Sequence, residues 1–239
     1  MRIEDPQRDP FGAALRAYQS GQRNATVQVY SDIAIDDVMP VRYLFRNYEE
    51  MPAWEQAALQ ACRGRVLDLG AGAGGHALWL QAAGHEVVAL DQSPGAVEVM
   101  QQRGLQAVWH ADYRDLAGET FDTLLLMMNG IGVVGDLKGL NEFLTLARGW
   151  LRPGGQILLD SSDIRYLYET EGVALPLPDG RYHGVIQYQM TFGAVQGDAF
   201  RWLYLDYRKL VKQAEHAGWR CACLAKGPHY EYLARLTLA

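Results

Sequence analysis

The sequence is poor in cysteine, in long apolar runs and in clustered positive charge, and each shortage excludes a class of protein. It has 3 cysteines in 239 residues, and the Cys221-x-Cys223 spacing is unfavourable for a disulfide on one strand face. No apolar stretch approaches the roughly 20 residues that span a bilayer. The first ten residues are polar and contain two prolines, unlike a signal peptide. We therefore expect a cytoplasmic protein with no membrane partner.

The chain also lacks a basic face and a metal-ligand pattern. Lys and Arg total 22 against 28 Asp and Glu, which gives a net charge of -6 with no basic run. Proteins that follow a polyphosphate backbone usually carry a basic surface, so we expect no nucleic-acid partner. No histidine, cysteine and acid group has ligand spacing, which predicts no metal. Apolar residues make up 49% and charged residues 21%, as in ordinary globular enzymes.

The most informative segment, residues 66–75, carries an acid into a glycine-rich turn. It reads Val-Leu-Asp-Leu-Gly-Ala-Gly-Ala-Gly-Gly, so that Asp68 lies two residues before the first glycine. Backbone N–H groups can approach a ligand closely where glycine leaves no side chain. Asp91 ends the next apolar run and Asp112 follows the one after it. Since parallel strands end at one edge of a sheet, where open α/β folds bind ligands, these acids should line one site.

Strand-like and helix-like patterns alternate from residue 65 onward, which predicts an α/β fold with a doubly wound, largely parallel sheet. Before it, residues 1 to about 35 show little periodicity and look like an irregular or helical arm, whereas residues 38–62 show helical spacing. Residues 1–62 are expected to form an N-terminal helical segment that covers the site. Residues 63–239 are expected to form the sheet domain, with an aromatic β insertion at 161–205 that contains two antiparallel strands. The expected strands of the main sheet are 65–70, 86–91, 106–110, 121–128 and 156–160, followed by a hairpin over 219–225 and 230–238.

The glycine turn fits more than one nucleoside cofactor. Gly70, Gly72 and Gly75 satisfy G-x-G-x-x-G, and Asp91 lies about 20 residues further on, where an acid meets a ribose diol. A nicotinamide dinucleotide would satisfy that pattern, but Asp68 would repel its pyrophosphate. S-adenosylmethionine has no phosphate and carries an ammonium, a sulfonium and one carboxylate. An acid is then favourable near the ammonium, while glycine N–H groups can meet the carboxylate.

In these segments the chain resembles the class I S-adenosylmethionine-dependent methyltransferases. The resemblance covers about residues 65–160 and implies a Rossmann-like, seven-stranded sheet whose last strand is antiparallel. It implies that Asp68 and the glycine turn hold the methionyl part, Asp91 the ribose hydroxyls and Asp112 the adenine amino group. The matching segments, in order, are Leu-Asp-Leu-Gly-Ala-Gly-Ala-Gly (67–74), Leu-Asp-Gln-Ser-Pro (90–94), Ala-Asp (111–112), Phe-Asp (121–122) and Leu-Arg-Pro-Gly-Gly (151–155). The expected cofactor-binding residues are Arg46, Asp68, Gly70, Ala71, Gly72, Gly74, Asp91, Gln92, Asp112, Tyr113 and Asn129.

The expected catalytic residues are Asn129, Asp160 and Asp163. Methyl transfer starts from an activated sulfonium, so the protein mainly aligns the acceptor and no universal catalytic residue is expected. Asn129 follows the central strand and could hold the cofactor's amino group, orient the acceptor or cap a turn. Asp160 or Asp163 could act as general base, bind a cationic acceptor or simply form a turn. The segment at Asn129 lacks the Asn/Asp-Pro-Pro-Tyr/Phe motif of the branch that methylates DNA or protein glutamine, which disfavours those substrates.

Side chains outside the sheet supply further candidates. Arg46 could pair with the methionyl carboxylate, and Tyr43 or Phe45 could face the sulfonium through a cation–π contact, or this stretch could simply pack on the sheet. We expect His76 to be a neutral bystander near the cofactor. Three more histidines could move a proton only if they reach the cleft: His110, His183 and His229. The insertion could roof an acceptor pocket, or could pack as a β-arm or dimer surface, with Tyr166, Tyr168, Tyr182, Tyr188, Phe192, Phe200, Trp202 and Tyr204.

The sequence thus predicts a cytoplasmic S-adenosylmethionine-dependent methyltransferase that acts on an oxygen or nitrogen of a small-molecule acceptor. Two other functions stay open: a catalytically silent subunit that binds S-adenosylmethionine, and a nicotinamide-dependent oxidoreductase, which Asp68 disfavours. A homodimer formed through the insertion also stays open.

Overall fold

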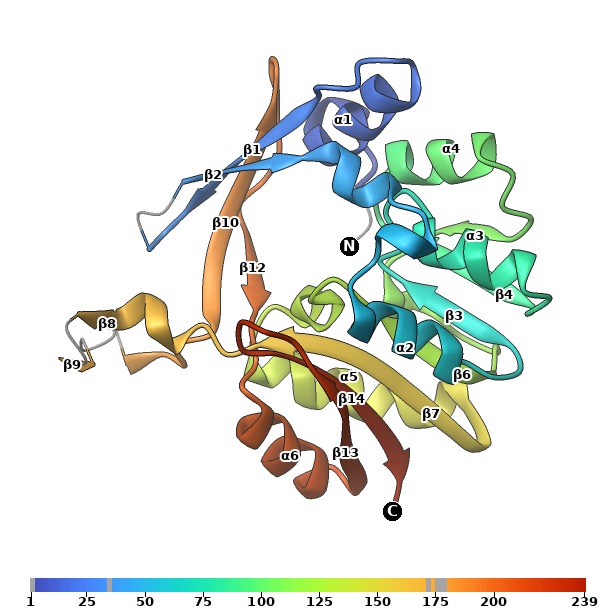
Figure 1. Ribbon diagram of the computed structural model, residues 1–239, viewed down its shortest axis with the longest axis vertical. Coiled ribbons are helices and arrows are strands. Elements are labelled where there is room, and N and C mark those ends of the chain that lie inside the picture. The colour runs from blue at the N-terminus through green and yellow to red at the C-terminus, as the bar shows by residue number, and fades with distance from the viewer. Residues whose placement is uncertain (1–2, 34–35, 171–172, 175–179) are drawn as a thin grey trace.

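The main sheet confirms the predicted fold class. The computed structural model describes residues 3–33, 36–170, 173–174 and 180–239. Within them, seven strands form a sheet in the order β13-β14-β7-β6-β3-β4-β5 (Figure 1). The pairs within β7-β6-β3-β4-β5 are parallel, and β14 is antiparallel to both β7 and β13. The strands are β3 (Val66–Leu69), β4 (Val87–Asp91), β5 (Val108–His110), β6 (Phe121–Leu126), β7 (Leu151–Ser162), β13 (Trp219–Lys226) and β14 (Glu231–Leu238).

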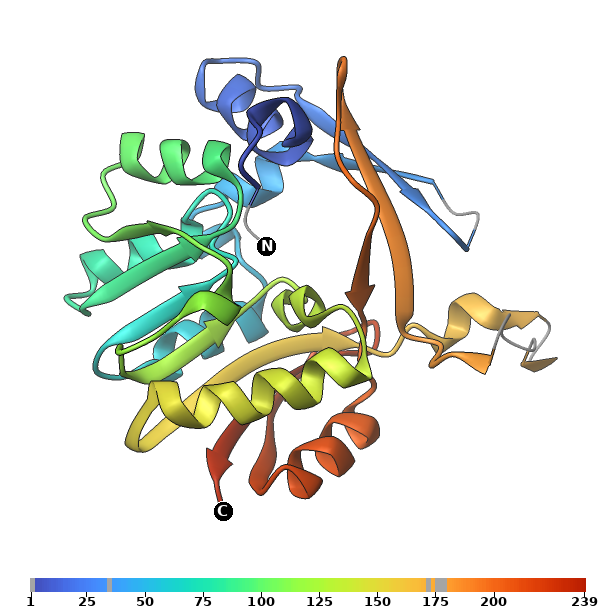
Figure 2. The ribbon, with the colours of Figure 1, turned by 180° about the vertical axis from the view of Figure 1, so that it is seen from behind.

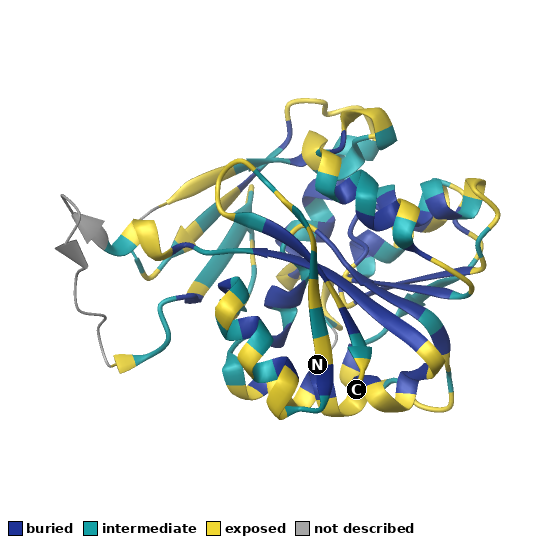
Figure 3. Cartoon of the chain, turned by 60° about the horizontal axis from the view of Figure 1, so that its bottom comes forward, coloured by how far each residue is buried: buried dark blue, intermediate teal, exposed yellow. Residues whose placement is uncertain are grey.

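Helices cover both faces of this sheet, which explains why the last three residues of β6 are all leucine. Leu124 and Leu126 of β6 pack with Phe143 in one core cluster, whereas Leu125 packs with Leu59 in the other. Alternate residues of a strand point to opposite faces, so each face receives its own apolar row. The central strands of the main sheet accordingly lie buried between partly exposed helices (Figure 3). The helices are α1 (Pro10–Gln19), α2 (Ala53–Ala61), α3 (Gly75–Ala82), α4 (Pro94–Gln102), α5 (Leu137–Trp150) and α6 (Tyr207–His216).

A second sheet joins the N-terminal segment to the insertion. In the described residues it contains β1 (Thr26–Ser31), β2 (Asp37–Pro40), β10 (Val185–Phe192), β11 (Val195–Gln196) and β12 (Phe200–Leu203). Strand β10 pairs antiparallel with β12, which confirms the two predicted strands of the insertion, and also with β1. Figures 1 and 2 show this sheet standing on the side toward which β7 runs.

The expectation of a helical segment preceded by an irregular or helical arm missed β1 and β2. The segment does contain α1 and α2 with short 3₁₀ helices, but β1 and β2 form a hairpin between them. The partner of β1 is β10, more than 150 residues away, with Gln28 opposite Thr191. A local pattern cannot reveal so distant a partner. The remaining short elements are η1 (Pro6–Arg8), η2 (Val41–Phe45), η3 (Tyr48–Glu50), η4 (Tyr113–Asp115), η5 (Gly130–Val134), η6 (Arg165–Tyr168), β8 (Glu169–Thr170) and β9 (Val173–Ala174).

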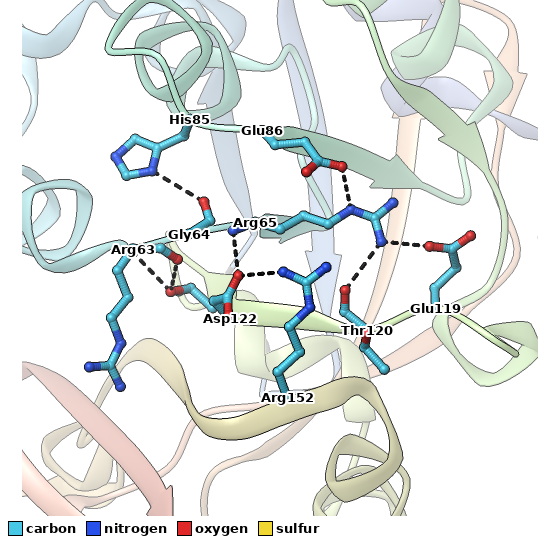
Figure 4. A network of polar contacts seen from close by, with 10 residues as sticks. Arg63, Gly64, Arg65, His85, Glu86, Glu119, Thr120, Asp122 and Arg152 are labelled. Atoms are coloured by element: carbon cyan, nitrogen blue, oxygen red, sulfur yellow. Dashed lines mark hydrogen bonds and ion pairs between the residues drawn. The ribbon is translucent and has the colours of Figure 1, made fainter.

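An ionic network fixes the amino-terminal edge of the sheet, opposite the predicted site (Figure 4). Asp122, at the start of β6, accepts the backbone N–H of Arg65 at 2.7 Å and a guanidinium N–H of Arg152 at 2.8 Å. The Arg65 guanidinium donates to Glu119 at 2.6 Å. These contacts hold the starts of β3, β6 and β7 in register. Asp122 belongs to one of the segments that resemble the methyltransferase family, and it stabilises the fold far from the carboxyl edge.

None of the helices in the described ranges has both the length and the apolar composition that crossing a membrane requires.

Candidate functional site

The glycine turn leaves open space above the end of β3. Gly70, Gly72 and Gly74 all have positive φ, between +57° and +77°, a conformation that other residues adopt with strain. A Cβ built on Gly70 would meet no described atom within 4 Å. The backbone N–H groups of Gly70 and Ala71 donate to Leu90 O, and those of Gly72 and Gly74 also donate within the protein. The expected contact between these N–H groups and a ligand carboxylate is therefore not supported, and the turn serves the site mainly by lacking side chains.

Asp68 lies below this turn with one oxygen unpaired. The residue is 2% exposed, and its Oδ2 has no hydrogen-bond partner among the described residues. Burial raises the pKa of Asp68 to about 6, although a positive charge on His76 acts to lower it. A buried carboxylate oxygen without a partner is costly, and a cationic ligand would remove that cost.

Asp91 ties the end of β4 to the glycine turn. Its two oxygens accept the N–H groups of Gly72 and Ser93, each at 2.9 Å. Burial, the largest influence, raises the pKa of Asp91, and these N–H groups act in the opposite direction. Each carboxylate oxygen keeps a second lone pair, so Asp91 can still accept hydroxyl donors.

The residues after β5 occupy the next position along the edge. The Asp112 carboxylate is buried, accepts the Arg114 N–H at 2.9 Å and lies 3.2 Å from the Arg114 guanidinium. Tyr113 was expected to bind the cofactor, but its ring packs edge-on against Phe143 in the core. The structure therefore gives no support to a contact through the Tyr113 side chain. The backbone oxygen of Gln92 accepts the Ile3 N–H at 3.0 Å, which brings the start of the chain across this edge.

Asn129 connects three elements at the end of β6. Its amide nitrogen donates to Leu203 O at 3.2 Å, and its amide oxygen accepts the Ser161 hydroxyl at 2.5 Å. Its backbone N–H donates to Asp160 at 2.8 Å. Met128 and Asn129 both have positive φ, 59° and 56°, so this turn stores backbone strain. The side chain thus holds β6, β7 and β12 together, and direct contact with cofactor or acceptor stays a prediction.

The structure separates the two acids near the end of β7, Asp160 within the strand and Asp163 just after it. Asp160 is 5% exposed, and burial raises its pKa to about 7. The electrostatic neighbours of its carboxylate include Glu55 and His76. Asp163 is partly exposed, bonds with Arg165 at 3.3 Å and lies 3.4 Å from Nε2 of His183. Asp160 thus lies among the buried charged groups near the glycine turn, whereas Asp163 contacts Arg165 and His183.

An Arg46–Glu55–His76 chain links the N-terminal segment to the first turn of α3. Arg46 Nη2 donates to both Glu55 oxygens, at 2.9 and 3.1 Å, and His76 Nε2 lies 3.1 Å from Glu55 Oε2. Burial lowers the pKa of His76, but the hydrogen bond to Glu55 and nearby acids outweigh it, and the pKa is raised. The raised pKa and the hydrogen bond to Glu55 disfavour the expected neutral bystander.

Sequence reasoning missed Glu55, although a signal was present. Glu55 is 3% exposed and shares one helix face with Ala58 and Leu59, which are fully buried. An acid at helical spacing with core residues needs a buried partner, and that rule would have marked it.

Asp9 is a second acid that sequence reasoning missed. It is fully buried and accepts the N–H groups of Gly12 and Gly95, at 2.8 and 3.0 Å, and the Ser93 hydroxyl at 2.7 Å. It therefore fixes the starts of α1 and α4 together beside Asp91.

The remaining candidates lie at the margin of the site or away from it. Phe45 packs at a tilt against Tyr18, with ring centroids 4.5 Å apart, in the cluster between α1 and α4, whereas Tyr43 is 44% exposed. His110 contacts Gln92 O at 2.9 Å, and the His229 backbone N–H donates to Glu231 at 2.7 Å. Among the described residues, no group of three or more histidines, cysteines and acids could hold a metal ion.

Part of the aromatic insertion lies against the carboxyl edge. Trp202 of β12 packs on Gly132 of η5, where an added Cβ would fall 2.0 Å from the indole nitrogen. The hydroxyl groups of Tyr188 and Tyr204 lie 3.2 Å apart. This packing brings the second sheet over the end of β6, as a roof over an acceptor site requires.

Comparison with known proteins identifies the family that this chain resembles. Residues 66–155 match the methyltransferase domain family. A solved SAM-dependent methyltransferase from Bacteroides fragilis, in complex with S-adenosyl-L-homocysteine, is 40% identical, with a TM-score of 0.91 over 100% of this chain and 98% of that chain.

Two curated relatives match shorter stretches. Demethylmenaquinone methyltransferase of Clavibacter sepedonicus is 40% identical over 101 residues, which is 40% of this chain and 40% of that protein. The tRNA U34 carboxymethyltransferase of Idiomarina loihiensis is 30% identical over 146 residues, which is 54% of this chain and 42% of that protein. The matches thus span less than half the length of these two relatives, whose acceptors differ. The likeness to the solved relative extends over the whole chain, and with the acids and glycine turn in place, this chain belongs to the class I S-adenosylmethionine-dependent methyltransferases.

Proposed function

We propose that this protein transfers the methyl group of S-adenosylmethionine to an oxygen or nitrogen of a small-molecule acceptor. The observation that carries the proposal is the buried Asp68 Oδ2 without a partner, beside a turn with open space above Gly70. When bound, the cofactor supplies a methyl group on a sulfonium, which is already an activated leaving group.

The residues present fit each part of that cofactor. Asp68 offers its free oxygen to the ammonium, and Asp91 can accept the ribose hydroxyls. Asp112 is placed one strand further along for the adenine amino group. Arg46 is suited to the carboxylate, because no described residue takes its Nη1 hydrogens. The methionyl carboxylate would thus meet a guanidinium rather than the glycine N–H groups.

On the acceptor side, the chain has to align a nucleophile and receive its proton. The acceptor's lone pair forms the new bond to the methyl carbon, the electrons of the broken bond stay on sulfur, and the acceptor's proton must leave. Asp160 is suited to receive that proton, because burial raises its pKa to about 7. Asn129 fixes the turn beside it through Ser161 and Leu203.

Two features support a small acceptor. The second sheet packs over the end of β6 through Trp202, and the N-terminal residues cross Gln92, so the carboxyl edge is covered from two directions. The net charge of -6 is also unfavourable for a polyanionic acceptor.

The test is a transfer assay with S-adenosylmethionine labelled in its methyl group. We would add the protein to a cell extract, separate low-mass metabolites, RNA and protein, and count the label in each fraction. Label in the low-mass fraction, lost in Asp68→Asn, is the expected result. Label in RNA or protein would refute the small acceptor, and cofactor binding without transfer to any fraction would favour a silent binding subunit.

A further inference from the structure

The Arg46–Glu55–His76 chain joins residues from three different elements. Arg46 follows η2, Glu55 lies in the first turn of α2, and His76 lies in the first turn of α3. The Arg46 backbone oxygen also lies 3.3 Å from the position of an added Cβ on Gly75, so this segment rests on the glycine turn. All three side chains are largely buried, with exposures of 17%, 5% and 10%. A substitution at Glu55 would therefore affect both Arg46 and His76.

The buried charges around Glu55 do not balance within the protein. With each acid ionised and His76 protonated, the buried group would hold three carboxylates, on Glu55, Asp68 and Asp160, and two cations, on Arg46 and His76. Glu55 bonds with both cations, and Asp160 accepts the Asn129 N–H. One negative charge is left over, and the unpaired oxygen is on Asp68. A ligand ammonium at Asp68 would pair with that charge.

The other titratable groups near Asp68 do not supply the missing positive charge. Asp91 is a further acid, so its charge opposes ionisation of Asp68. The Cys62 thiol stays neutral, because burial raises its pKa to about 12. His76 is thus the cation that favours the ionised form of Asp68.

We propose that Glu55 and His76 are positioning residues of the methyl-donor site. Glu55 holds His76 as an imidazolium near Asp68, which keeps Asp68 ionised for the ligand's ammonium. The same carboxylate holds Arg46 with its Nη1 group available for the ligand's carboxylate. The inference rests on the proposed function, since it assigns both charged ends of the methionyl group to one buried chain.

A purely structural ion pair would not produce the same behaviour. A buried ion pair is weak evidence for stability, because desolvation offsets much of the attraction. If the Arg46–Glu55–His76 contacts only held α2 against α3, their loss would weaken ligand binding equally at every pH. If it sets the ionisation of Asp68, its loss moves the pH at which binding fails.

The test measures the affinity for S-adenosylhomocysteine by calorimetry between pH 5.5 and 8.5. Removing a neighbouring positive charge raises a carboxyl pKa by about 1–3 units. For His76→Gln, a rise of about two units would weaken binding about tenfold at pH 7 and by only about 1.3-fold at pH 8.5. Glu55→Gln should move the profile the same way, because His76 then loses the partner that keeps it protonated. Glu55→Asp should restore part of the profile.

Two exposed residues provide matched controls. His85→Gln removes a histidine that bonds to Gly64 O, and Glu98→Gln removes an acid on α4. Both should leave the wild-type profile unchanged. An equal loss of affinity at all pH values in His76→Gln and Glu55→Gln, or an unmoved profile, would overturn the inference.

A second measurement uses the protein without ligand. The imidazole of His76, followed by NMR, should titrate above the ordinary histidine value in the wild type and lower in Glu55→Gln. Should a variant fail to fold, a wild-type midpoint at or below that ordinary value would still refute the inference. Absence of binding to the wild type at every pH would refute the proposed function itself, whereas wild-type binding with unmoved variants refutes only this inference.

Discussion

Replacing Asp68 by Asn should make the ligand-free protein more stable while it weakens cofactor binding. The two side chains have the same shape, and Oδ2 of Asp68 has no partner to lose within the described part of the chain. The substitution removes a buried negative charge that the fold tolerates but does not pair. Opposite effects on stability and on binding are typical of a residue kept for a ligand rather than for the fold.

The magnitude follows from the pKa of Asp68, which burial raises from 3.8 to about 6. A raised carboxyl pKa in the folded state contributes stability below about pH 4, and this contribution is lost as the pH rises through about 6. The full difference at pH 8 corresponds to about 3 kcal/mol at most, since one pKa unit is about 1.4 kcal/mol. Unpaired N–H groups of the new amide cost about 1 kcal/mol, which leaves a gain of about 1–2 kcal/mol at pH 8.

Urea unfolding at pH 4 and pH 8 measures this effect, and calorimetry with S-adenosylhomocysteine measures binding. We expect equal or slightly lower stability of Asp68→Asn at pH 4, higher stability at pH 8, and affinity at pH 8 reduced about 10- to 150-fold. Asp198→Asn, at an exposed ion pair with Arg8, should change neither. Lower stability of Asp68→Asn at pH 8 would show that its charge already has a partner, and the reasoning would fail.

Three further substitutions test other parts of the site. Asp91→Ala should weaken binding of S-adenosylhomocysteine by about 1.5–3 kcal/mol. Because two N–H groups lose their acceptor, it should also lower the free energy of unfolding by about 2 kcal/mol. Unchanged affinity in calorimetry would place the ribose elsewhere. Asn129→Ala should reduce turnover more than cofactor affinity, since it loosens the link between β6 and β12, and equal losses in kinetics and calorimetry would count against that role. Gly132→Ala forces a Cβ to within 2.0 Å of Trp202 and should lower the free energy of unfolding by about 1–3 kcal/mol in thermal unfolding. An unchanged Tm would show that Trp202 packs loosely on η5.

Local sequence patterns were sufficient to predict the main sheet. Helical and strand periodicities act within single elements, and start signals such as Ser93-Pro94 at α4 depend only on neighbouring residues. The acids Asp68, Asp91 and Asp112 were predictable as a group because parallel strands must end at one edge. These features need no knowledge of contacts between distant residues.

Features that depend on distant contacts could not be predicted in this way. The pairing of β1 with β10 joins the N-terminal segment to the insertion, and neither strand shows its partner in its own pattern. The link between Glu55 and His76 depends on how α2 packs against α3. Asn129 looked available for ligands, but folding brings Leu203 O to its amide.

The central claim is that Asp68 receives the ammonium of a bound S-adenosyl nucleoside. A crystal structure with S-adenosylhomocysteine tests it most directly. The account predicts the ammonium within about 3 Å of Asp68 Oδ2, with the ribose hydroxyls at Asp91. A nucleoside bound away from the glycine turn, or Asp68 Oδ2 still without a cationic partner, would contradict it.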